Sequence, residues 1–506
     1  MYLIMLYLIL MKIAIAYPPF DDIKGTPLLS QNRQFQVFHN PTYIYPVVPA
    51  QAATLLKKVG HQVVWLDGIA EGWTYNQWLK ELKQTGSDLI VIETKTPVIK
   101  RHWKIISNIK SLIPNIKIVL VGDHVTALPE ESFENSQVDF VLTGGDYDFL
   151  LLNLVNHLTK KEKLEPGVYY RDKKKIVGNT GQFQLNHDLN KLPFIDRELT
   201  KWQLYAYENG NYKRMPGTYI MAGRDCWWRR NGGCKFCAWT VLYPTWRTRK
   251  PEKVLDEIGE LIEKYKIREV MDDTGTFPVG EYLREFCRGM IKRGYNKKIY
   301  FDCNFRFGAL TKDDYELMAK AGFRFLLYGL ESASQKTVDG LNKGIKINQI
   351  EKELKQAKKA NREVGGHLEP HVTCMVGFPW ETKKEAEKTI EMTRNLFAKG
   401  LIDTLQATMV IPYPGTALFK ECQKKGWLKT KNWEDYDMSK PVMKTPMSDK
   451  EVMGLTQGIY KSFITPKFIA RKILSVRNSD DLKFLWRAGK AVFGHLADFK
   501  GARKWI

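Results

Sequence analysis

The stretch YIMAGRDCWWRRNGGCKFCAW, residues 219–239, joins a strand-like run to a loop that holds three cysteines. Its first four residues are apolar, as in a buried strand. Cys226, Cys234 and Cys237 follow, with seven residues between the first pair and two between the second. A pair of glycines stands in the longer gap, where glycine lets the backbone turn tightly. The stretch therefore predicts a strand followed directly by a metal-binding loop.

The order of strand and helix repeats after this loop. Amphipathic helical spacing lies between further strand-like runs at 268–275, 298–306, 324–332, 368–379 and 403–415. Six strand and helix units in sequence predict a partial or full (β/α) barrel over residues 216–415, with functional groups where its strands end. Residues 416–506 have no strand-like run and predict a helical, basic C-terminal domain.

The chain before the loop also alternates. Helical patterns separate five β-rich runs, at 12–19, 62–67, 88–94, 117–124 and 138–145. They predict a doubly wound, Rossmann-like parallel sheet over residues 11–158, and such sheets bind ligands at the carboxyl ends of their strands. Residues 159–215, with a hairpin pattern at 166–179, are expected to form a connector. The fold class is therefore α/β.

Composition limits the class of protein. With 506 residues, 44% hydrophobic and 26% charged, the chain can form two to four packed domains and is not disordered. The net charge of +22 favours anionic partners, although a solvated basic surface explains it equally well. The apolar residues 1–10 are too short to span a bilayer and predict either an extended start before Met11 or a weak surface anchor. We expect a cytoplasmic protein with no transmembrane segment.

The three clustered cysteines admit two metal sites. A structural zinc needs a fourth ligand, and because no histidine lies between His187 and His367, that ligand would be Cys287 or Cys303. Three thiolates with one vacant position suit a [4Fe–4S] cluster that is open to a small molecule. Arginines and tryptophans around the thiols keep a zinc-knuckle nucleic-acid-binding protein as the alternative from another class.

Ordered motifs resemble a known family. Downstream of the paired CxxC stand MDDTGTF (271–277), FRFG (305–308), YGLES (328–332), GFPWET (377–382) and IPYPGT (411–416). In this order they resemble the radical S-adenosylmethionine (SAM) enzymes. The preceding domain, with ETKTP (93–97) and VDFVLTGG (138–145), resembles the cobalamin-binding domain of the B12-dependent branch. The gap of seven residues between Cys226 and Cys234 departs from the family's common spacing, which is CxxxCxxC.

The resemblance implies an activity. A [4Fe–4S] cluster on the three cysteines would bind and cleave SAM, and cobalamin would deliver a methyl group to an unactivated carbon. We therefore expect a C-methyltransferase, with a non-methylating cyclisation or rearrangement as the alternative within the same chemistry. We expect a small-molecule substrate, anionic or lipid-like, and an electron donor such as flavodoxin or ferredoxin. No nucleic acid partner is expected.

The resemblance and the strand ends also suggest binding residues, although none is assigned to catalysis. SAM contacts are expected from Asp273, Asn304, Arg306, Glu331, Ser332 and Gly377. Cobalamin contacts are expected from Glu93, Thr94, Thr96, Thr143, Gly144 and Gly145. The aspartate pair of MDDTGTF has a second interpretation, as the cap of the next helix. His124 is expected to be a hydrogen-bonded or loop histidine and not a ligand of cobalt, since no D-x-H-x-x-G motif is present.

Overall fold

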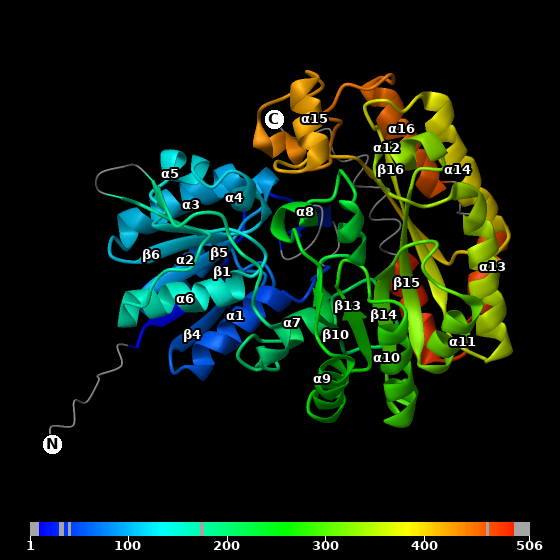
Figure 1. The fold of residues 1–506 in the computed structure, drawn as a ribbon, viewed down its shortest axis with the longest axis horizontal. Helices are drawn as coiled ribbons and strands as arrows, with labels where there is room; N and C mark the ends of the chain where they lie inside the picture. Colours follow the sequence, from blue (N-terminus) through cyan, green and yellow to red (C-terminus); the bar gives the residue numbers. More distant parts are fainter. Residues whose placement is uncertain (1–9, 30–34, 39–41, 173–176, 462–464, 490–506) are drawn as a thin grey trace.

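The computed structural model describes residues 10–29, 35–38, 42–172, 177–461 and 465–489. Residues 1–9, and with them most of the apolar opening, lie outside the described residues, as does the end of the predicted C-terminal domain. Figure 1 shows two α/β units side by side, the first in blue and cyan and the second in green and yellow. Within the described residues, no helix is both long and apolar enough to cross a membrane.

The first unit is a sheet with helices on both faces. Its five parallel strands lie in the order β4-β1-β5-β6-β7, and β8 and β9 extend it antiparallel beyond β7. The bounds are β1 Lys12–Tyr17, β4 Gln62–Asp67, β5 Leu89–Glu93, β6 Lys117–Val121, β7 Phe140–Leu142, β8 Val168–Tyr170 and β9 Gly178–Asn179. The strand order reverses between β1 and β5, which makes this the switch point where doubly wound sheets bind ligands.

Alternation along the strands explains why helices cover both faces. Ile13, Ile15, Leu89 and Val91 pack on one side with the helices α1 (Val47–Lys58) and α6 (Tyr147–Lys160). Ala14, Ala16, Ile90 and Ile92 pack on the other side with α2 (Tyr75–Thr85) and α3 (Ile99–Leu112). Both sets are apolar, as in a parallel sheet that is buried on its two faces.

The second unit is a six-stranded parallel sheet in the order β10-β13-β14-β15-β16-β17. Its strands are β10 Gly217–Ile220, β13 Glu269–Asp272, β14 Tyr300–Phe305, β15 Phe323–Glu331, β16 Glu369–Val376 and β17 Thr404–Met409. The helices between them are α9 Pro251–Glu263, α10 Glu281–Lys292, α11 Lys312–Lys320, α12 Gln335–Gly340, α13 Ile347–Glu363 and α14 Lys383–Ala398. In the described chain β10 and β17 do not pair, so the barrel is partial. The predicted α/β fold class is confirmed.

A short antiparallel ribbon anchors the cysteine loop to the first unit. β11 (Gly223–Arg224) pairs with β12 (Arg247–Thr248) and closes the loop between them. The buried Arg224 donates to Asp146, 2.9 Å away, and to Asp148, 2.5 Å away. Although burial alone would raise it, Arg224 and Arg247 hold the pKa of Asp146 well below its usual range. The ribbon therefore fixes the cysteine loop against the N-terminal sheet.

Where it is described, the C-terminal region is mainly helical, as the sequence predicts, although residues 425–448 between two of its helices form turns and loops. It contains α15 Ala417–Lys424, α16 Asp449–Lys461, α17 Pro466–Leu474 and a helical stretch at 479–489. One strand-like contact departs from that expectation, an antiparallel bridge between Leu428 and Met443. The domain boundaries drawn from the sequence stay a prediction.

Candidate active site

A cavity of about 240 Å³ lies at the carboxyl ends of the barrel strands. All three clustered cysteines line it. Residues from the ends of β13, β14, β15, β16 and β17 form its wall, and part of the chain between β1 and α1 covers it. This is the end of a parallel barrel where active sites lie.

The backbone of the cysteine loop brings the thiols to the cavity. After Cys226 the chain makes a 3-10 turn, η3 (Trp227–Asn231). Gly232 and Gly233 then take left-handed φ values of 84° and 73°, which turn the chain back and suit glycine. The N–H of Cys237 donates to the carbonyl of Cys234 at 3.2 Å, so the CxxC pair forms one tight turn.

The Arg229 side chain bridges the two ends of this loop. It donates to the Asp225 carboxylate at 2.8 Å through Nη2 and to the Tyr243 carbonyl at 3.0 Å through Nε. A Cβ on Gly233 would lie 2.2 Å from Nη1 of Arg229, so glycine makes room for the guanidinium. Burial opposes its charge, but the hydrogen bond and charge of Asp225 raise the pKa of Arg229. The side chain therefore holds the long gap between the cysteines in one shape.

The MDDTGTF loop after β13 supports the first cysteine. The Asp272 carboxylate accepts from the N–H of Ala222 at 2.6 Å and of Thr274 at 3.0 Å. A Cβ on Gly275 would lie 2.8 Å from the Asp225 backbone, so only glycine allows this approach. The Thr276 hydroxyl lies 2.9 Å from Sγ of Cys226. A hydroxyl placed there can donate to a thiolate.

The two aspartates of that loop differ in position. The Asp272 side chain is fully buried and is hydrogen-bonded by backbone N–H groups, and burial raises its pKa to about 7. Asp273 lines the cavity. The helix that follows, α10, begins after Gly280 and has no side-chain cap, so the helix-cap interpretation of the pair is wrong.

Arg306 and Asn304, from the end of β14, both line the cavity. Nη1 of Arg306 lies 3.6 Å from Sγ of Cys234, and its guanidinium carbon lies 4.3 Å from the centroid of the Trp228 ring. Nη2 donates to the carbonyl of Lys343. Nε of Arg306 is buried and finds no partner among the described residues. Arg306 therefore places a cation beside one thiol and keeps a donor available.

Glu331 and Lys343 form an ion pair in the same wall. Nζ of Lys343 lies 2.7 Å from Oε1 of Glu331, and both side chains are almost fully buried. A Cβ on Gly329 would lie 2.4 Å from Nζ, so that glycine gives the pair its space. Glu331 has a left-handed φ of 64°, an unusual conformation that is often found at functional sites.

Two of the residues expected at SAM do not reach the cavity. The Ser332 hydroxyl donates to Oε1 of Glu381 at 3.1 Å, and the N–H of Gly377 donates to Oε2 at 3.0 Å. Burial raises the pKa of Glu381 to about 7. Glu381, of the GFPWET motif, thus ties the ends of β15 and β16 together behind the cavity wall.

The residues expected at cobalamin are all buried, at or just after the carboxyl ends of β5 and β7. The Tyr17 hydroxyl donates to Glu93, while Thr94 hydrogen-bonds His102 at 2.7 Å and Thr96 hydrogen-bonds His124 at 3.1 Å. His124 also contacts Glu131 at 3.0 Å, so the expectation of a hydrogen-bonded histidine is confirmed, although the residue lies in the short helix α4 (Asp123–Ala127) and not in a loop.

Of the other three residues, only Gly145 lies against the second unit, while Thr143 and Gly144 contact the chain just before β8 and just after β9. The Thr143 hydroxyl donates to the Gly167 carbonyl at 2.8 Å. A Cβ on Gly144 would lie 2.5 Å from the ring of Phe183, and one on Gly145 would lie 1.9 Å from the ring of Tyr243. The two glycines therefore let aromatic rings pack against the backbone there.

Several cavity residues were not predicted. Lys343 follows α12, and Gln36 comes from the chain between β1 and α1 and hydrogen-bonds Gln406 of β17 at 3.1 Å. Because the helix α12 separates Lys343 from Glu331 in the sequence, only a sequence motif for this ion pair could have predicted Lys343 as a site residue. The Gln36 contact joins residues far apart in the sequence and left no signal there.

The thiols fit a cluster better than a single metal ion. Among the described residues, no group of three or more His, Cys, Asp or Glu side chains could hold one ion. A tetrahedral zinc would require its thiolates to converge on one centre at about 2.3 Å. In a [4Fe–4S] cluster each thiolate binds a different iron, so the sulfurs stand further apart. Donors beside two of the sulfurs, from Arg306 and Thr276, also suit thiolates.

Comparisons with known proteins agree with this geometry. A family model of the radical SAM superfamily matches residues 223–393. The chain is 27% identical over 436 residues to a protein of Pyrococcus horikoshii named uncharacterized methyltransferase PH0819, covering 85% of this chain and 90% of that protein. It is 26% identical to the anaerobic magnesium-protoporphyrin IX monomethyl ester cyclase of Cereibacter sphaeroides, covering 83% of this chain and 67% of that enzyme.

Two of the similar solved structures share the fold over almost the whole of this chain. The radical SAM methyltransferase TsrM of Kitasatospora setae, solved with cobalamin and a [4Fe–4S] cluster bound, superposes with a TM-score of 0.67 at 13% identity and covers 96% of this chain and 99% of that one. The cobalamin-dependent SAM radical enzyme OxsB gives a TM-score of 0.67 at 16% identity and covers 97% and 72%. Residues 223–393 are therefore a radical SAM domain, and the chain as a whole has the fold of these two cobalamin-dependent enzymes.

Proposed function

We propose that this protein is a cobalamin-dependent radical SAM C-methyltransferase that acts on a small molecule. The observation that carries the proposal is the placement of Cys226, Cys234 and Cys237 on one cavity with charged strand-end residues. When bound, the cluster and cobalamin supply the reductive cleavage of SAM and the methyl transfer. The protein supplies the geometry, the charges and the exclusion of water.

The cavity charges support a site for SAM. The methionine part of SAM carries an ammonium and a carboxylate, and the wall offers groups of both signs. We propose that Asp273 and Glu331 face the ammonium, while Arg306 faces the carboxylate with its unpartnered Nε. Asn304, whose amide donates to the Thr274 carbonyl at 3.0 Å, would fix this wall. Ser332 and Gly377 would act only by holding the strand ends behind it.

The switch point of the N-terminal sheet supports cobalamin binding in part. Tyr17, Glu93 and Tyr147 surround a small space of about 10 Å³ at the carboxyl ends of β1 and β5. The Tyr147 hydroxyl is buried with no partner among the described residues, so a polar cofactor could satisfy it. Glu93, Thr94 and Thr96 remain the proposed contacts. Gly144 and Gly145 are less suited to a cofactor, because the rings of Phe183 and Tyr243 already cover them, and the Thr143 hydroxyl is held by the Gly167 carbonyl.

A second candidate is a cyclisation without methyl transfer. It is favoured by the similarity to the magnesium-protoporphyrin IX monomethyl ester cyclase, which extends over 435 residues. For either candidate we also propose a small-molecule substrate, a cytoplasmic location and an electron donor of the flavodoxin or ferredoxin type.

Anaerobic reconstitution with iron, sulfide and cobalamin tests the proposal. We expect about four irons per chain and the formation of 5′-deoxyadenosine from SAM under a strong reductant. With SAM that carries a deuterated methyl group and a small-molecule extract of the source cells, mass spectrometry should find the label on carbon. Deoxyadenosine without label in any product would support the cyclase instead. A colourless protein with one zinc per chain would overturn both candidates.

A further inference from the structure

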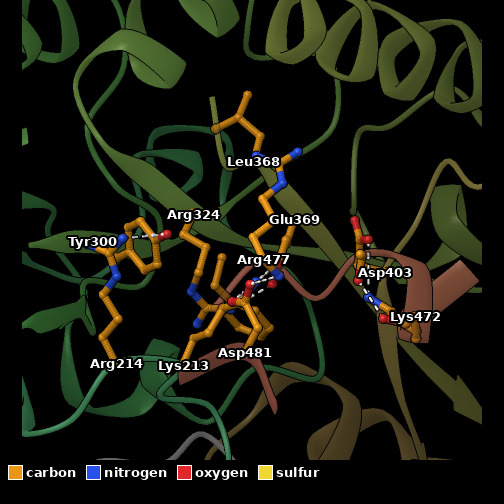
Figure 2. Close-up of polar contacts among 12 residues, drawn as sticks. Lys213, Arg214, Tyr300, Arg324, Leu368, Glu369, Asp403, Lys472, Arg477 and Asp481 are labelled. Atoms are coloured by element: carbon orange, nitrogen blue, oxygen red, sulfur yellow. Dashed lines mark hydrogen bonds and ion pairs between the residues drawn. The ribbon is translucent and has the colours of Figure 1, made fainter. Parts of the chain in front are cut away.

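The last described segment, residues 465–489, crosses the barrel at the end opposite the cavity. It contains α17 and the helical stretch at 479–489. Its charged side chains meet residues at the amino ends of the strands, as Figure 2 shows for Asp481 and Lys472. Nζ of Lys213 lies 3.2 Å from Asp481, and Nζ of Lys472 lies 3.2 Å from Asp403. These ion pairs join the segment to the barrel, and Phe468 packs edge-on against Phe397 beside them, with ring centroids 5.4 Å apart.

Further contacts of the same kind extend along the segment. Arg471 donates to the Phe397 carbonyl at 2.7 Å, and Arg487 donates to the Tyr212 carbonyl at 2.8 Å. Asp480 pairs with Arg268 at 2.6 Å. Both helical parts of the segment are therefore held to the barrel by charged groups.

The opposite side of the segment is apolar and exposed. The exposed fractions are 47% for Ile469, 62% for Ile473, 84% for Leu474, 63% for Leu482 and 70% for Trp486. A surface helix of a water-soluble protein normally turns its apolar side inward and its charges outward. Here charged side chains, together with Phe468 and Phe484, meet the barrel, and the five apolar side chains are left exposed. An apolar surface presented in this way is typical of an interaction site.

The charge around this surface indicates what it binds. Residues 465–489 contain six Lys and Arg against two Asp, and residues 490–506 add four Lys and Arg against one Asp. Exposed Lys467 and Lys483 stand beside the apolar side chains. An apolar face with basic neighbours and a tryptophan fits the headgroup region of an anionic bilayer. A nucleic acid would leave the aliphatic side chains without a contact, and a second copy would bring like charges together.

We propose that residues 465–489 form a docking surface for bilayers that contain anionic phospholipid. The apolar side chains of α17 and of 479–489 enter the interface, and the lysines beside them contact headgroup phosphates. Because the cavity lies at the other end of the strands, docking leaves its mouth free. Membrane attachment and SAM cleavage are therefore separable properties of the chain.

Flotation of the full-length protein with vesicles tests this proposal. We expect it to float with phosphatidylcholine vesicles that contain phosphatidylglycerol, to bind pure phosphatidylcholine much less, and to be released by high salt. In the double variant Ile473→Asp with Leu474→Asp, partitioning onto the anionic vesicles should fall about tenfold or more. Both side chains are exposed, so the fold should persist, and deoxyadenosine formation from SAM should stay as in the wild type.

A matched control separates this surface from general charge. The variant Val59→Asp with Leu112→Asp adds the same two charges at exposed apolar positions of the N-terminal unit, and it should float like the wild type. Equal loss in both double variants would overturn the proposal, as would failure of the wild type to float. Light scattering gives one more outcome: a wild-type dimer that becomes a monomer in the Ile473 and Leu474 variant would make this face a self-association surface instead.

Discussion

The two ends of the barrel use the same kinds of side chain in opposite ways. At the amino end, Arg324 donates to Glu269 at 2.6 Å, to Asp302 at 2.9 Å and to Glu369 at 2.8 Å, and it is almost fully buried. At the carboxyl end, Arg306 reaches a cysteine sulfur and a backbone carbonyl, and it borders a cavity. The first arginine meets acids of its own chain, whereas the second has no carboxylate partner among the contacts described above.

This difference separates the charged groups that stabilise the barrel from those that are available to a ligand. Charges that compensate one another hold the strands together, and removal of one leaves buried charges uncompensated. Charges that line a cavity are available to a ligand, and their removal should alter binding with little effect on the fold. Substitutions at four places in the barrel test or refine this contrast.

The largest effect is expected at the thiols. Replacing Cys226, Cys234 or Cys237 with alanine should abolish SAM cleavage and remove the visible absorbance of the cluster, because three thiolates are needed to hold it. Cys303→Ala is the matched control, since its side chain is buried in β14 and does not line the cavity. Iron analysis and deoxyadenosine assays check this. A cluster that survives any one of the three substitutions would contradict the assignment.

The next effect is on stability, at the amino end. Arg324→Met should destabilise the protein by about 3–5 kcal/mol, because Glu269 and Asp302 stay buried without their cation. Denaturation in urea, followed by circular dichroism, measures this loss. The exposed pair of Lys399 with Glu351 serves for comparison, and Lys399→Met should cost less than about 1 kcal/mol. Similar losses in the two variants would mean that the Arg324 network contributes no more than a surface pair.

A pH experiment tests the buried Asp272. Burial raises its pKa from 3.8 to about 7. The folded chain therefore keeps a proton that the unfolded chain has released between these values, so this carboxyl makes stability fall as pH rises through that window. In Asp272→Asn, the unfolding free energy should fall less steeply with pH, by up to about 1.4 kcal/mol per unit. Urea titrations at several pH values measure both slopes, and equal slopes would show that Asp272 does not titrate there.

The smallest effect is expected from a conservative change at the cavity. Arg306→Lys keeps the charge but loses the planar group that meets both Cys234 and the Lys343 carbonyl. SAM affinity of the reconstituted protein should fall about tenfold, equivalent to about 1.4 kcal/mol. Its midpoint in urea should match that of the wild type. A large loss of stability with unchanged affinity would place Arg306 with Arg324 as a structural group.

Much of the fold could be predicted because local pattern decides it. Apolar runs predicted the strands of both sheets, and the helical patterns between them marked where each strand ends. Only the short paired strands β2 with β3 and β11 with β12 were not predicted. The cysteines could be predicted as a site because they are close in the sequence. The partial closure of the barrel could not, since it depends on which edges pair.

Apart from the cysteines, the site could be predicted only at its strand ends. Asp273, Asn304, Arg306 and Glu331 stand at or just after the carboxyl ends of strands and line the cavity. Ser332 occupies an equivalent place, but Glu381 captures its hydroxyl behind the wall. Lys343 and Gln36 come from a later turn and a remote loop, and nothing local marks them. Side-chain direction and tertiary contact decide these cases.

The contact of Arg224 with Asp146 and Asp148 constrains how this chain can be divided. The arginine stands two residues before the first cysteine, and its carboxylate partners belong to the N-terminal unit. A barrel fragment made alone would therefore present the base of its cysteine loop to water, without the groups that orient it. The two units therefore depend on each other. A chimaera that replaces either unit with that of another protein must keep the arginine and both aspartates.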